Sequence, residues 1–377
     1  MADFEYKEIN MKVLHIVSNL SIRNGVMAVL MNYYRNIDTS IIQFGFMYFD
    51  EVPETYEEEI KQLGGEIFKI ARVTRLKGFR NDINAFSKEH FGEYQILHIH
   101  EIYITGFFWR VKKQTGIKKI IVHSHATRFS DHKLKEIRNQ ILSEANRFLP
   151  DYYFACSKKA GQIAFKKRFD KVGIVINNAI NTDNFYPDKN LKEEIKKSFG
   201  LEGKFVIGHI GNFTPQKNHS FLINVFECIL KRNNNAVLVL IGDGHLREQV
   251  LNNCKTKNID KNILYLGTRS DVHRVIHCFD KFLFPSVYEG LGIVLIEAQS
   301  VGIPCVFSDV IPKEANILQE CNRVLSLNDD ADEWAEAVLE NNEIKIDEVT
   351  KKIMEAGYSI KTEADKLQKI YQRILTE

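Results

Sequence analysis

The sequence contains few prolines, no long apolar stretch and almost no net charge. Seven of its 377 residues are proline, and no segment is low in complexity. It has no run of about 18 apolar residues, which a membrane-spanning helix would need. The formal net charge of +2 argues against a dedicated nucleic-acid-binding protein, which would carry a large basic excess. A hydrophobic content of 44% with 27% charged residues is instead typical of a globular protein.

The six cysteines show no pairing pattern. None of them forms a CxxC motif, and most lie inside apolar runs. We therefore expect reduced cysteines in a protein core rather than a disulfide framework. The first ten residues are polar and acidic, unlike the basic and then apolar start of a signal peptide. Both features favour a cytoplasmic protein.

Short apolar runs alternate with helix-length amphipathic stretches along the whole chain. The runs begin near residues 12, 41, 95, 119, 152 and 171 in the first half, and near 204, 236, 262, 281 and 304 in the second. This alternation predicts an α/β fold with two doubly wound, mostly parallel sheets. We expect an N-terminal domain over 1–185 and a C-terminal domain over 186–355, with the active site in the cleft between them.

The last segment, 356–377, contains one more amphipathic helix, over about 361–375. Apolar residues recur on one face of it, namely Ala364, Leu367, Ile370, Tyr371 and Ile374. A helix with such a face needs a surface to cover. We expect it to pack back on the N-terminal domain.

The strongest chemical signal lies in 284–307, where a predicted strand, a glycine-rich loop and a helix follow one another. The loop contains Glu289 and Gly292, and the helix is expected to start near Ile293, with Glu297 one turn further on. Glycine lets a backbone come close to a ligand, and the free amides at a helix start bind anions. The two carboxylates can accept several hydrogen bonds from sugar hydroxyls. The alternative is a buried strand–loop–helix unit with two incidental acids.

A second loop of this kind follows the strand that ends near Gly211. It contains Asn212, Thr214 and Lys217, and a helix is expected to begin around Asn218. A lysine beside free helix amides suits a diphosphate group. Taken alone, a lysine before a helix is more often simply solvated.

Together these segments resemble the retaining glycosyltransferases of family 4, which have the GT-B fold. The resemblance rests on EGLGIVLIEA at 289–298, GNFTPQKNHSFLI at 211–223, IGDG at 241–244 and LGTRSDV at 266–272, with looser matches at 97–101, 122–126 and 155–161. It covers about 11–375 and points to bacterial enzymes that build capsular, exopolysaccharide or other surface glycans. It implies two Rossmann-like domains that face a central cleft, with the C-terminal helix crossing back to the N-terminal domain.

The resemblance also implies a reaction. A sugar would move from a nucleotide-diphosphate donor, with uridine as the favoured base, to a hydroxyl of a glycan or lipid-linked acceptor. The expected catalytic residues are Glu289 at the donor sugar, Lys217 at the diphosphate, and His125 by the reaction centre, with His123 as the second choice. Neither a metal nor another cofactor is expected.

The other residues that the resemblance implies would bind the donor. The ribose would meet Glu297, and the base would meet the backbone at Thr268 and Arg269. The diphosphate would be held by Gly25, Asn212, Lys217 and the backbone of Leu291, Gly292, Ile293 and Val294. Asn212 stands where such proteins usually carry arginine, and it has no charge with which to grip phosphate.

Three other functions are compatible with these residues. Asn212 keeps open a non-catalytic GT-B partner subunit, while the intact Glu289, Lys217 and Glu297 argue against one. A nucleotide-sugar epimerase would use the same donor site without an acceptor. A glycoside hydrolase also uses two carboxylates, but the phosphate-binding loop argues for a nucleotide donor.

Histidines alternate on two predicted strands of the first half. His98 and His100 share one face of a strand, as do His123 and His125. Four imidazoles are able to bind a metal ion, but only Glu101 accompanies them as a further ligand type. Hydrogen-bonded histidines near strand ends are therefore favoured, particularly for His98 and His123.

The small net charge hides a division within the chain. Residues 1–185 carry 27 basic and 21 acidic side chains, a net of +6, and 186–377 carry 24 and 28, a net of −4. Within the first half, 101–171 has 16 basic and 6 acidic residues, a net of +10. We interpret this segment as a surface for anionic lipid headgroups on the inner face of the cell membrane, with 157–169 as a basic amphipathic helix and Ile163 and Phe165 as apolar contacts. A solvated helix face is the alternative, and nothing in the sequence indicates an oligomeric state.

Overall fold

The structure is a computed structural model that describes residues 11–127, 133–342 and 344–377. The chain forms two compact units. The N-terminal unit comprises Met1–Ala179 and Ile360–Glu377, and the C-terminal unit comprises Ile180–Ser359. The boundaries expected after residues 185 and 355 lie near these divisions but not on them. None of the helices in the described ranges is both long and apolar enough to cross a membrane.

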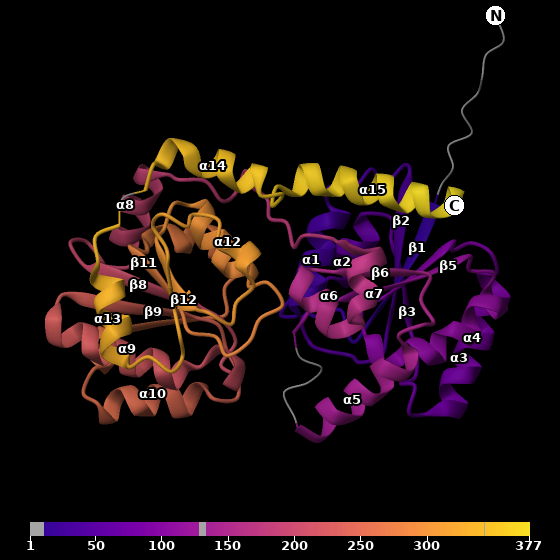
Figure 1. Ribbon diagram of the computed structural model, residues 1–377, viewed down its shortest axis with the longest axis horizontal. Helices are drawn as coiled ribbons and strands as arrows, with labels where there is room; N and C mark the ends of the chain where they lie inside the picture. The colour runs from indigo at the N-terminus through magenta and orange to yellow at the C-terminus, as the bar shows by residue number, and fades with distance from the viewer. Residues whose placement is uncertain (1–10, 128–132, 343) are drawn as a thin grey trace, which may run out of the picture. The chain divides into compact units, whose positions relative to one another are not determined.

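The N-terminal unit is built on a seven-stranded parallel sheet in the order β3-β2-β1-β4-β5-β6-β7 (Figure 1). The strands are β1 (Met11–Val17), β2 (Ile42–Tyr48), β3 (Glu66–Lys69), β4 (Ile96–Ile99), β5 (Lys119–Ser124), β6 (Tyr152–Ala155) and β7 (Gly173–Val175). The helices are α1 (Gly25–Tyr34), α2 (Glu57–Gln62), α3 (Leu76–Glu89), η1 (Ile102–Ile104), α4 (Thr105–Thr115), α5 (Lys133–Asn146), α6 (Lys158–Phe165), α7 (Lys167–Val172) and α15 (Ile360–Thr376). The strand order reverses between β1 and β4: β2 and β3 extend the sheet on the β1 side, and β5, β6 and β7 extend it on the β4 side.

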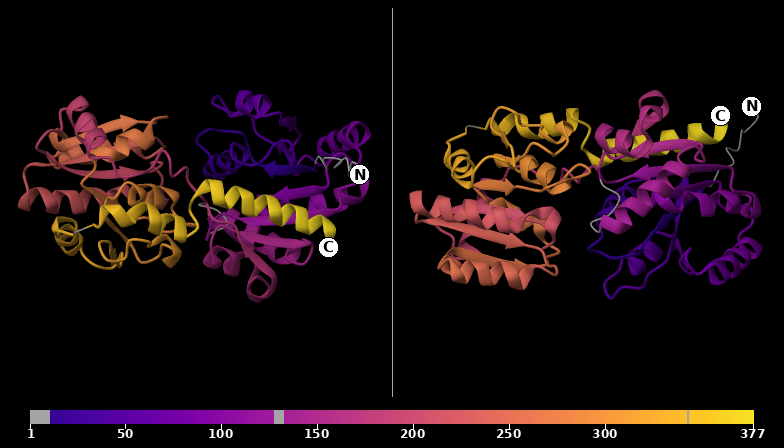
Figure 2. Two further views of the ribbon diagram at one scale, coloured as in Figure 1. Left: turned by 90° about the horizontal axis from the view of Figure 1, so that it is seen from above. Right: turned by 60° about the horizontal axis from the view of Figure 1, so that its bottom comes forward.

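The last helix, α15, belongs to the N-terminal unit, which confirms the expectation for it. All five apolar residues of its predicted face are buried. Tyr371 packs edge-on against Phe44 of β2, and its hydroxyl lies 2.7 Å from Nδ1 of His98 in β4. Figure 2 shows α15, in yellow, lying along the N-terminal unit. The helix therefore covers apolar sheet residues that would otherwise face water.

The C-terminal unit has a six-stranded parallel sheet in the order β10-β9-β8-β11-β12-β13. The strands are β8 (Phe205–Ile210), β9 (Ala236–Ile241), β10 (Ile263–Gly267), β11 (Lys281–Phe284), β12 (Cys305–Ser308) and β13 (Arg323–Leu325). The helices are α8 (Lys189–Ser198), η2 (Pro215–Lys217), α9 (His219–Arg232), α10 (Arg247–Thr256), η3 (Asp260–Asn262), α11 (Val272–Val275), η4 (Ile276–Cys278), α12 (Ile293–Ser300), η5 (Lys313–Ala315), α13 (Ala331–Leu339) and α14 (Ile346–Glu355). These two sheets confirm the expected α/β class.

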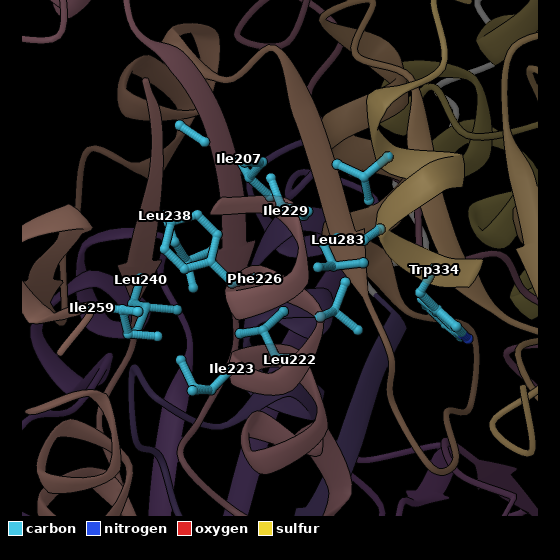
Figure 3. Packing of buried hydrophobic residues seen from close by; sticks show 14 of the residues in the cluster. Ile207, Leu222, Ile223, Phe226, Ile229, Leu238, Leu240, Ile259, Leu283 and Trp334 are labelled. Carbon is cyan, nitrogen blue, oxygen red and sulfur yellow. The ribbon is translucent and has the colours of Figure 1, made fainter. Parts of the chain in front are cut away.

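A dense apolar core fixes the strands that carry the site in the C-terminal unit (Figure 3). Leu222 and Phe226 of α9 pack against Leu238 of β9 and Leu283 of β11, and all four side chains are fully buried. Trp334 of α13 closes the cluster, and its indole N–H donates to the carbonyl oxygen of Ser326 at 3.0 Å. Each such buried side chain stabilises the fold by roughly 1.5–3 kcal/mol, so β8, β9 and β11 form a rigid base.

The structure corrects one sequence interpretation. The single helix expected over 157–169 is two short helices, α6 and α7, separated at Lys166, whose φ of +53° breaks the helical path. Phe165 is 1% exposed and packs in the core, so it cannot be an apolar contact for lipid. The short strands β3 and β13 were not predicted, because runs of three or four residues carry little periodic signal. The six cysteines are free, and all but Cys228 are buried.

Candidate active site

The strand order of the C-terminal sheet reverses between β8 and β11, which brings two loops together. β9 and β10 continue the sheet on one side, and β12 and β13 continue it on the other. In α/β folds the crevice at the carboxyl ends of such strands is where ligands bind. The loop after β8 carries Lys217, and the loop after β11 carries Glu289.

Lys217 and Glu289 form a largely buried ion pair between these loops. Nζ of Lys217 donates to Oε1 of Glu289 at 2.6 Å, and the two side chains are 15% and 8% exposed. The same ammonium group lies 4.6 Å from the centroid of the Phe284 ring, which favours the cation further. Because a lysine has three N–H donors, it can serve Glu289 and a phosphate oxygen together.

Further contacts brace the two loops against each other. The side-chain amide of Gln216 donates to the carbonyl oxygen of Tyr288 at 3.0 Å, and the amide of Val287 donates to the carbonyl oxygen of Gln216 at 2.8 Å. A side chain at Gly211 would put its Cβ 2.9 Å from the Lys217 stem. Glycine at this position therefore leaves room for the lysine to lie across the loop.

The start of α12 offers an anion site beside this pair. Helix α12 begins at Ile293, as expected, and its N-cap Gly292 has φ +85°, a left-handed conformation that favours glycine. Among the described residues no side chain caps the helix, and its first turn holds no acidic residue. The amides of Ile293 and Val294 have no acceptor within the helix, so together with the helix dipole they are suited to bind an anion. Leu291, just before the cap, is buried.

Glu297 lies one turn into α12, and its side chain makes no hydrogen bond or ion pair with the described part of the chain. Burial raises the pKa of its carboxyl group to about 7. Glu297 is half-buried, and a carboxyl group with little access to water weakens the fold when it ionises unless a ligand supplies hydrogen bonds. Ribose hydroxyls are donors of the kind it lacks.

The remaining predicted donor residues have different surroundings. Asn212 and Thr268 are exposed at the carboxyl ends of β8 and β10. Arg269 is held by Asp271 through two hydrogen bonds of 2.7 Å, which keep the guanidinium turned toward that carboxylate. A backbone role at Thr268 and Arg269 is compatible with this arrangement, because Asp271 occupies the arginine side chain.

Five histidines cluster in the N-terminal unit, on or just after the adjacent strands β1, β4 and β5. His15 of β1 joins the four histidines expected from the sequence. Its Nδ1 lies 3.0 Å from Nε2 of His100, whose Nδ1 lies 2.8 Å from Nε2 of His125. His98 bonds to Tyr371 as described above, whereas His123 stacks on His125 with centroids 4.0 Å apart. His15 was missed because its neighbours along β1 are apolar and nothing in the local sequence marks it.

Burial keeps these rings uncharged. The pKa values of His15 and His125 are lowered to about 3, and those of His98, His100 and His123 fall well below the ordinary value, in each case mainly through loss of contact with water. A neutral imidazole has one N–H and one acceptor nitrogen. In the chain of His15, His100 and His125, His100 must therefore donate to one neighbour and accept from the other. The position of the proton on His15 is thus coupled to its position on His125.

The histidine cluster also meets the distance condition for metal ligands. Ring nitrogens of His15, His98 and His100 lie within 4.8 Å of one another, as do those of His100, His123 and His125. Two of these contacts are the hydrogen bonds between neutral rings described above. The hydrogen bond of His98 to Tyr371 confirms the sequence interpretation for that residue. The interpretation is wrong for His123, whose ring stacks on His98 and His125 and has no hydrogen-bond partner among the described residues.

A polar cavity of about 820 Å³ opens at the carboxyl ends of β1, β2 and β3 in the same unit. Asn19, Asp50, Arg72 and Arg75 are among its lining residues, and Arg72 is paired with Asp50 through bonds of 2.6 and 2.7 Å. Gly25 opens α1 on this edge, and a side chain there would meet no atom within 4 Å. This edge offers hydrogen-bonding groups suited to a hydroxyl-rich ligand.

Comparison with known proteins decides the family. A family model described as "Glycosyl transferases group 1" matches residues 191–359. The "Putative glycosyltransferase EpsF" of Bacillus subtilis (strain 168) is 31% identical over 340 residues, which cover 87% of this chain and 86% of that protein. The chain belongs to the group 1 glycosyltransferases.

Two further similarities are consistent with this family. The "UDP-Gal:alpha-D-GlcNAc-diphosphoundecaprenol alpha-1,3-galactosyltransferase" of Escherichia coli is 25% identical over 317 residues, covering 79% of this chain and 80% of that one. The crystal structure of Anabaena Alr3699/HepE in complex with UDP and glucose matches with a TM-score of 0.74 at 15% identity, covering 97% of this chain and 100% of that one. The glycosyltransferase therefore has the GT-B fold, as the sequence resemblance implied.

Proposed function

We propose that this glycosyltransferase transfers a sugar from a uridine diphosphate donor to a hydroxyl of a glycan or lipid-linked acceptor in surface polysaccharide synthesis, with retention of anomeric configuration. One observation carries the donor assignment. The Lys217–Glu289 pair lies beside the start of α12, which no described side chain caps, and the carboxyl group of Glu297, one turn further along, has no partner within the described ranges. The names of the E. coli and Anabaena relatives, with their uridine nucleotides, support uridine as the base.

The proposed chemistry places positive charge where negative charge develops. As the bond from the anomeric carbon to the diphosphate breaks, its electron pair stays on the diphosphate. Lys217 and the amides of Ile293 and Val294 would stabilise that charge through donors already held in place. The acceptor hydroxyl would then attack the same face of the sugar and pass its proton to the departing diphosphate. This route requires no metal and no other cofactor.

The other residues take supporting roles in the proposal. Glu289 would accept hydrogen bonds from the donor sugar while it holds Lys217. Glu297 would bind the ribose, and the backbone at Thr268 and Arg269 would meet the base. Asn212 and Gly25 would border the diphosphate, and the backbone of Leu291 and Gly292 would approach it. His125 would be the catalytic residue that the N-terminal unit contributes.

A second candidate, a non-catalytic partner subunit, is favoured by one observation. Asn212 is exposed and neutral, so it would grip a phosphate less strongly than an arginine in that place. Lys217 and the start of α12 retain the positive groups that the donor needs, which favours the enzyme. Donor turnover by the purified chain alone would exclude this alternative, and an epimerase would convert the donor sugar without any acceptor.

The cavity beside β1, β2 and β3 is the proposed acceptor site, because Asn19 and Arg75 there can bond to sugar hydroxyls. We further propose that the protein works in the cytoplasm at the inner face of the membrane, where a lipid-linked acceptor would lie. The net charge of +10 over 101–171 supports this placement.

The test is a panel of nucleotide-sugars assayed for slow release of the nucleoside diphosphate, without an acceptor. We expect one uridine-linked sugar to be hydrolysed by the wild type and not by the Lys217→Ala variant. Lys261→Ala is the matched control, because Lys261 is exposed in η3, before β10 and hence at the opposite edge of the same sheet. Release that is equal in all three proteins would contradict the proposed role of Lys217.

A further inference from the structure

Helix α5 of the N-terminal unit has its apolar residues on the outside. Leu134, Ile137 and Ile141 are 84%, 55% and 63% exposed, and Phe148, just beyond the helix end, is 61% exposed. The spacing of three and four residues puts the first three side chains on one face of the helix, and Phe148 follows two residues after the helix ends. We call these four residues the α5 apolar face.

The opposite face of α5 is polar and buried. Asn139 and Ser143 are 5% and 1% exposed, and Asn146 donates to the carbonyl oxygen of Tyr103 in η1 at 3.1 Å. Arg138 lies over the Tyr103 ring, 5.7 Å from its centroid. The helix therefore packs on the protein through polar groups and presents apolar ones to water, the reverse of an ordinary surface helix.

Basic side chains lie at the Phe148 end of the α5 apolar face. The ring of Phe148 lies 4.6 Å from the guanidinium of Arg147 and 5.7 Å from that of Arg168. Glu144 is paired with both Arg147, at 2.9 Å, and Lys166, at 2.7 Å, so its negative charge is offset. Lys135 of α5 and Lys167, the first residue of α7, are also exposed. Apolar side chains bordered by cations fit the boundary between acyl chains and anionic headgroups.

The place of α5 in the fold links this face to the acceptor. Helix α5 packs against η1, the turn that follows β4, and so lies at the carboxyl edge of the N-terminal sheet. The proposed acceptor cavity and His125 lie at the same edge. Figure 1 shows α5 at the rim of the N-terminal unit.

We infer that the α5 apolar face, with Arg147, Lys166, Lys167 and Arg168, is a docking surface for an anionic lipid bilayer. This inference rests on the proposed function only in naming a lipid-linked acceptor as the reason for the docking. A second copy of the chain fits this face less well, because two segments of net charge +10 would be brought together. The surface differs from the one expected from the sequence, since α5 supplies the apolar contacts and α6 does not.

The test measures co-sedimentation of the full chain with vesicles at low and high salt. One set of vesicles contains equal parts of phosphatidylglycerol and phosphatidylcholine, and the other contains phosphatidylcholine alone. We expect binding to the anionic vesicles only, weakened by salt. Replacing Lys166, Lys167 and Arg168 by glutamine should weaken it about a hundredfold, at roughly 1 kcal/mol for each charge. Replacing Leu134, Ile137 and Ile141 by serine should weaken it roughly tenfold or more.

Two matched controls come from α3 and the loop after it. Glutamine at Lys77, Arg80 and Lys88, all exposed, removes three charges elsewhere in the unit, and Phe91→Ser removes an apolar side chain that is 66% exposed. Both control proteins should bind as the wild type does. Binding that ignores lipid charge, full binding by the serine variant, or no binding by the wild type would overturn the inference.

Two more measurements on the same proteins separate the alternatives. Sedimentation velocity without vesicles should show the same oligomeric state for the wild type and the serine variant. A wild-type dimer that the serine variant cannot form would assign the face to a second copy and overturn lipid docking. Binding of UDP, measured without vesicles, tests the proposed function separately, because no α5 residue belongs to the donor site.

Discussion

Replacing Glu297 by glutamine should stabilise the protein and at the same time impair nucleotide binding. Burial raises the pKa of this carboxyl group from 4.5 to about 7. In the unfolded chain the group ionises near its ordinary value, so above pH 7 the folded state alone carries the cost of a charge kept from water. With the pKa raised from 4.5 to about 7, ionisation of this group destabilises the folded state by about 3 kcal/mol.

The sign of the pH dependence follows from this shift. Below the unfolded pKa the carboxyl group is protonated in both states and costs nothing, and the stability falls as the pH rises from about 4.5 to about 7. Glu297→Gln removes the ionisation. The free energy of unfolding should therefore rise relative to the wild type by about 3 kcal/mol at about pH 8, and by about 1 kcal/mol at about pH 5.

The assay combines denaturant unfolding with calorimetric titration of UDP at the same two pH values. Wild-type affinity should increase with pH relative to Glu297→Gln, because ribose hydroxyls donate to the ionised carboxylate. The comparison with the variant corrects for titration of the diphosphate itself. Glu202→Gln is the control, because Glu202 is exposed in a loop of the same unit. A variant that is no more stable than the wild type at about pH 8 would show that the ionised Glu297 carboxylate does not destabilise the folded state.

The other residues of the two sites give three further predictions. Lys217→Met should lower the free energy of unfolding by about 3 kcal/mol, because the buried carboxylate of Glu289 loses the ammonium group that donates to it at 2.6 Å, and adding Glu289→Gln should recover part of the loss. Denaturant unfolding of the single and double variants tests this prediction, and additive losses would contradict it. Glu289→Gln should lower donor turnover at least about a hundredfold while UDP still binds. Steady-state rates measure the turnover and titration measures UDP binding. Turnover at the wild-type rate would show that Glu289 takes no part in the reaction. His100→Gln should change the tautomer of His125 and lower turnover without changing UDP affinity. The nitrogen NMR shifts of the His125 imidazole report the tautomer. An unaltered His125 spectrum would show that the hydrogen-bonded histidines do not position His125.

Local features of the donor site could be predicted from the sequence. The start of α12 at Ile293 and of α9 at His219 follows from a glycine or an asparagine placed between a strand and an amphipathic run. The ion pair of Lys217 with Glu289 could not be predicted in this way. The two residues are 72 positions apart, and only the order of β8 and β11 in the sheet makes them neighbours.

The N-terminal unit shows two further limits of sequence patterns. His15 joins the histidine cluster because β1 pairs with β4 in a register that places it opposite His98. Nothing in the residues next to His15 reveals that register. Helix α5 has an ordinary amphipathic period, and periodicity alone favours burial of its apolar side. The structure buries Asn139 and Ser143 instead, because η1 offers polar groups to pack against.

The most direct test of the account is calorimetric titration of UDP into the wild type, Lys217→Ala and Lys261→Ala at one pH and salt concentration. In the proposed donor site the diphosphate lies between Lys217 and the start of α12, and this placement sets the expected result. It therefore predicts saturable binding of one UDP to the wild type and to Lys261→Ala, with affinity at least about tenfold weaker in Lys217→Ala through loss of a charge-assisted hydrogen bond. Equal affinity in all three proteins, or no binding by the wild type, would contradict the proposed donor site.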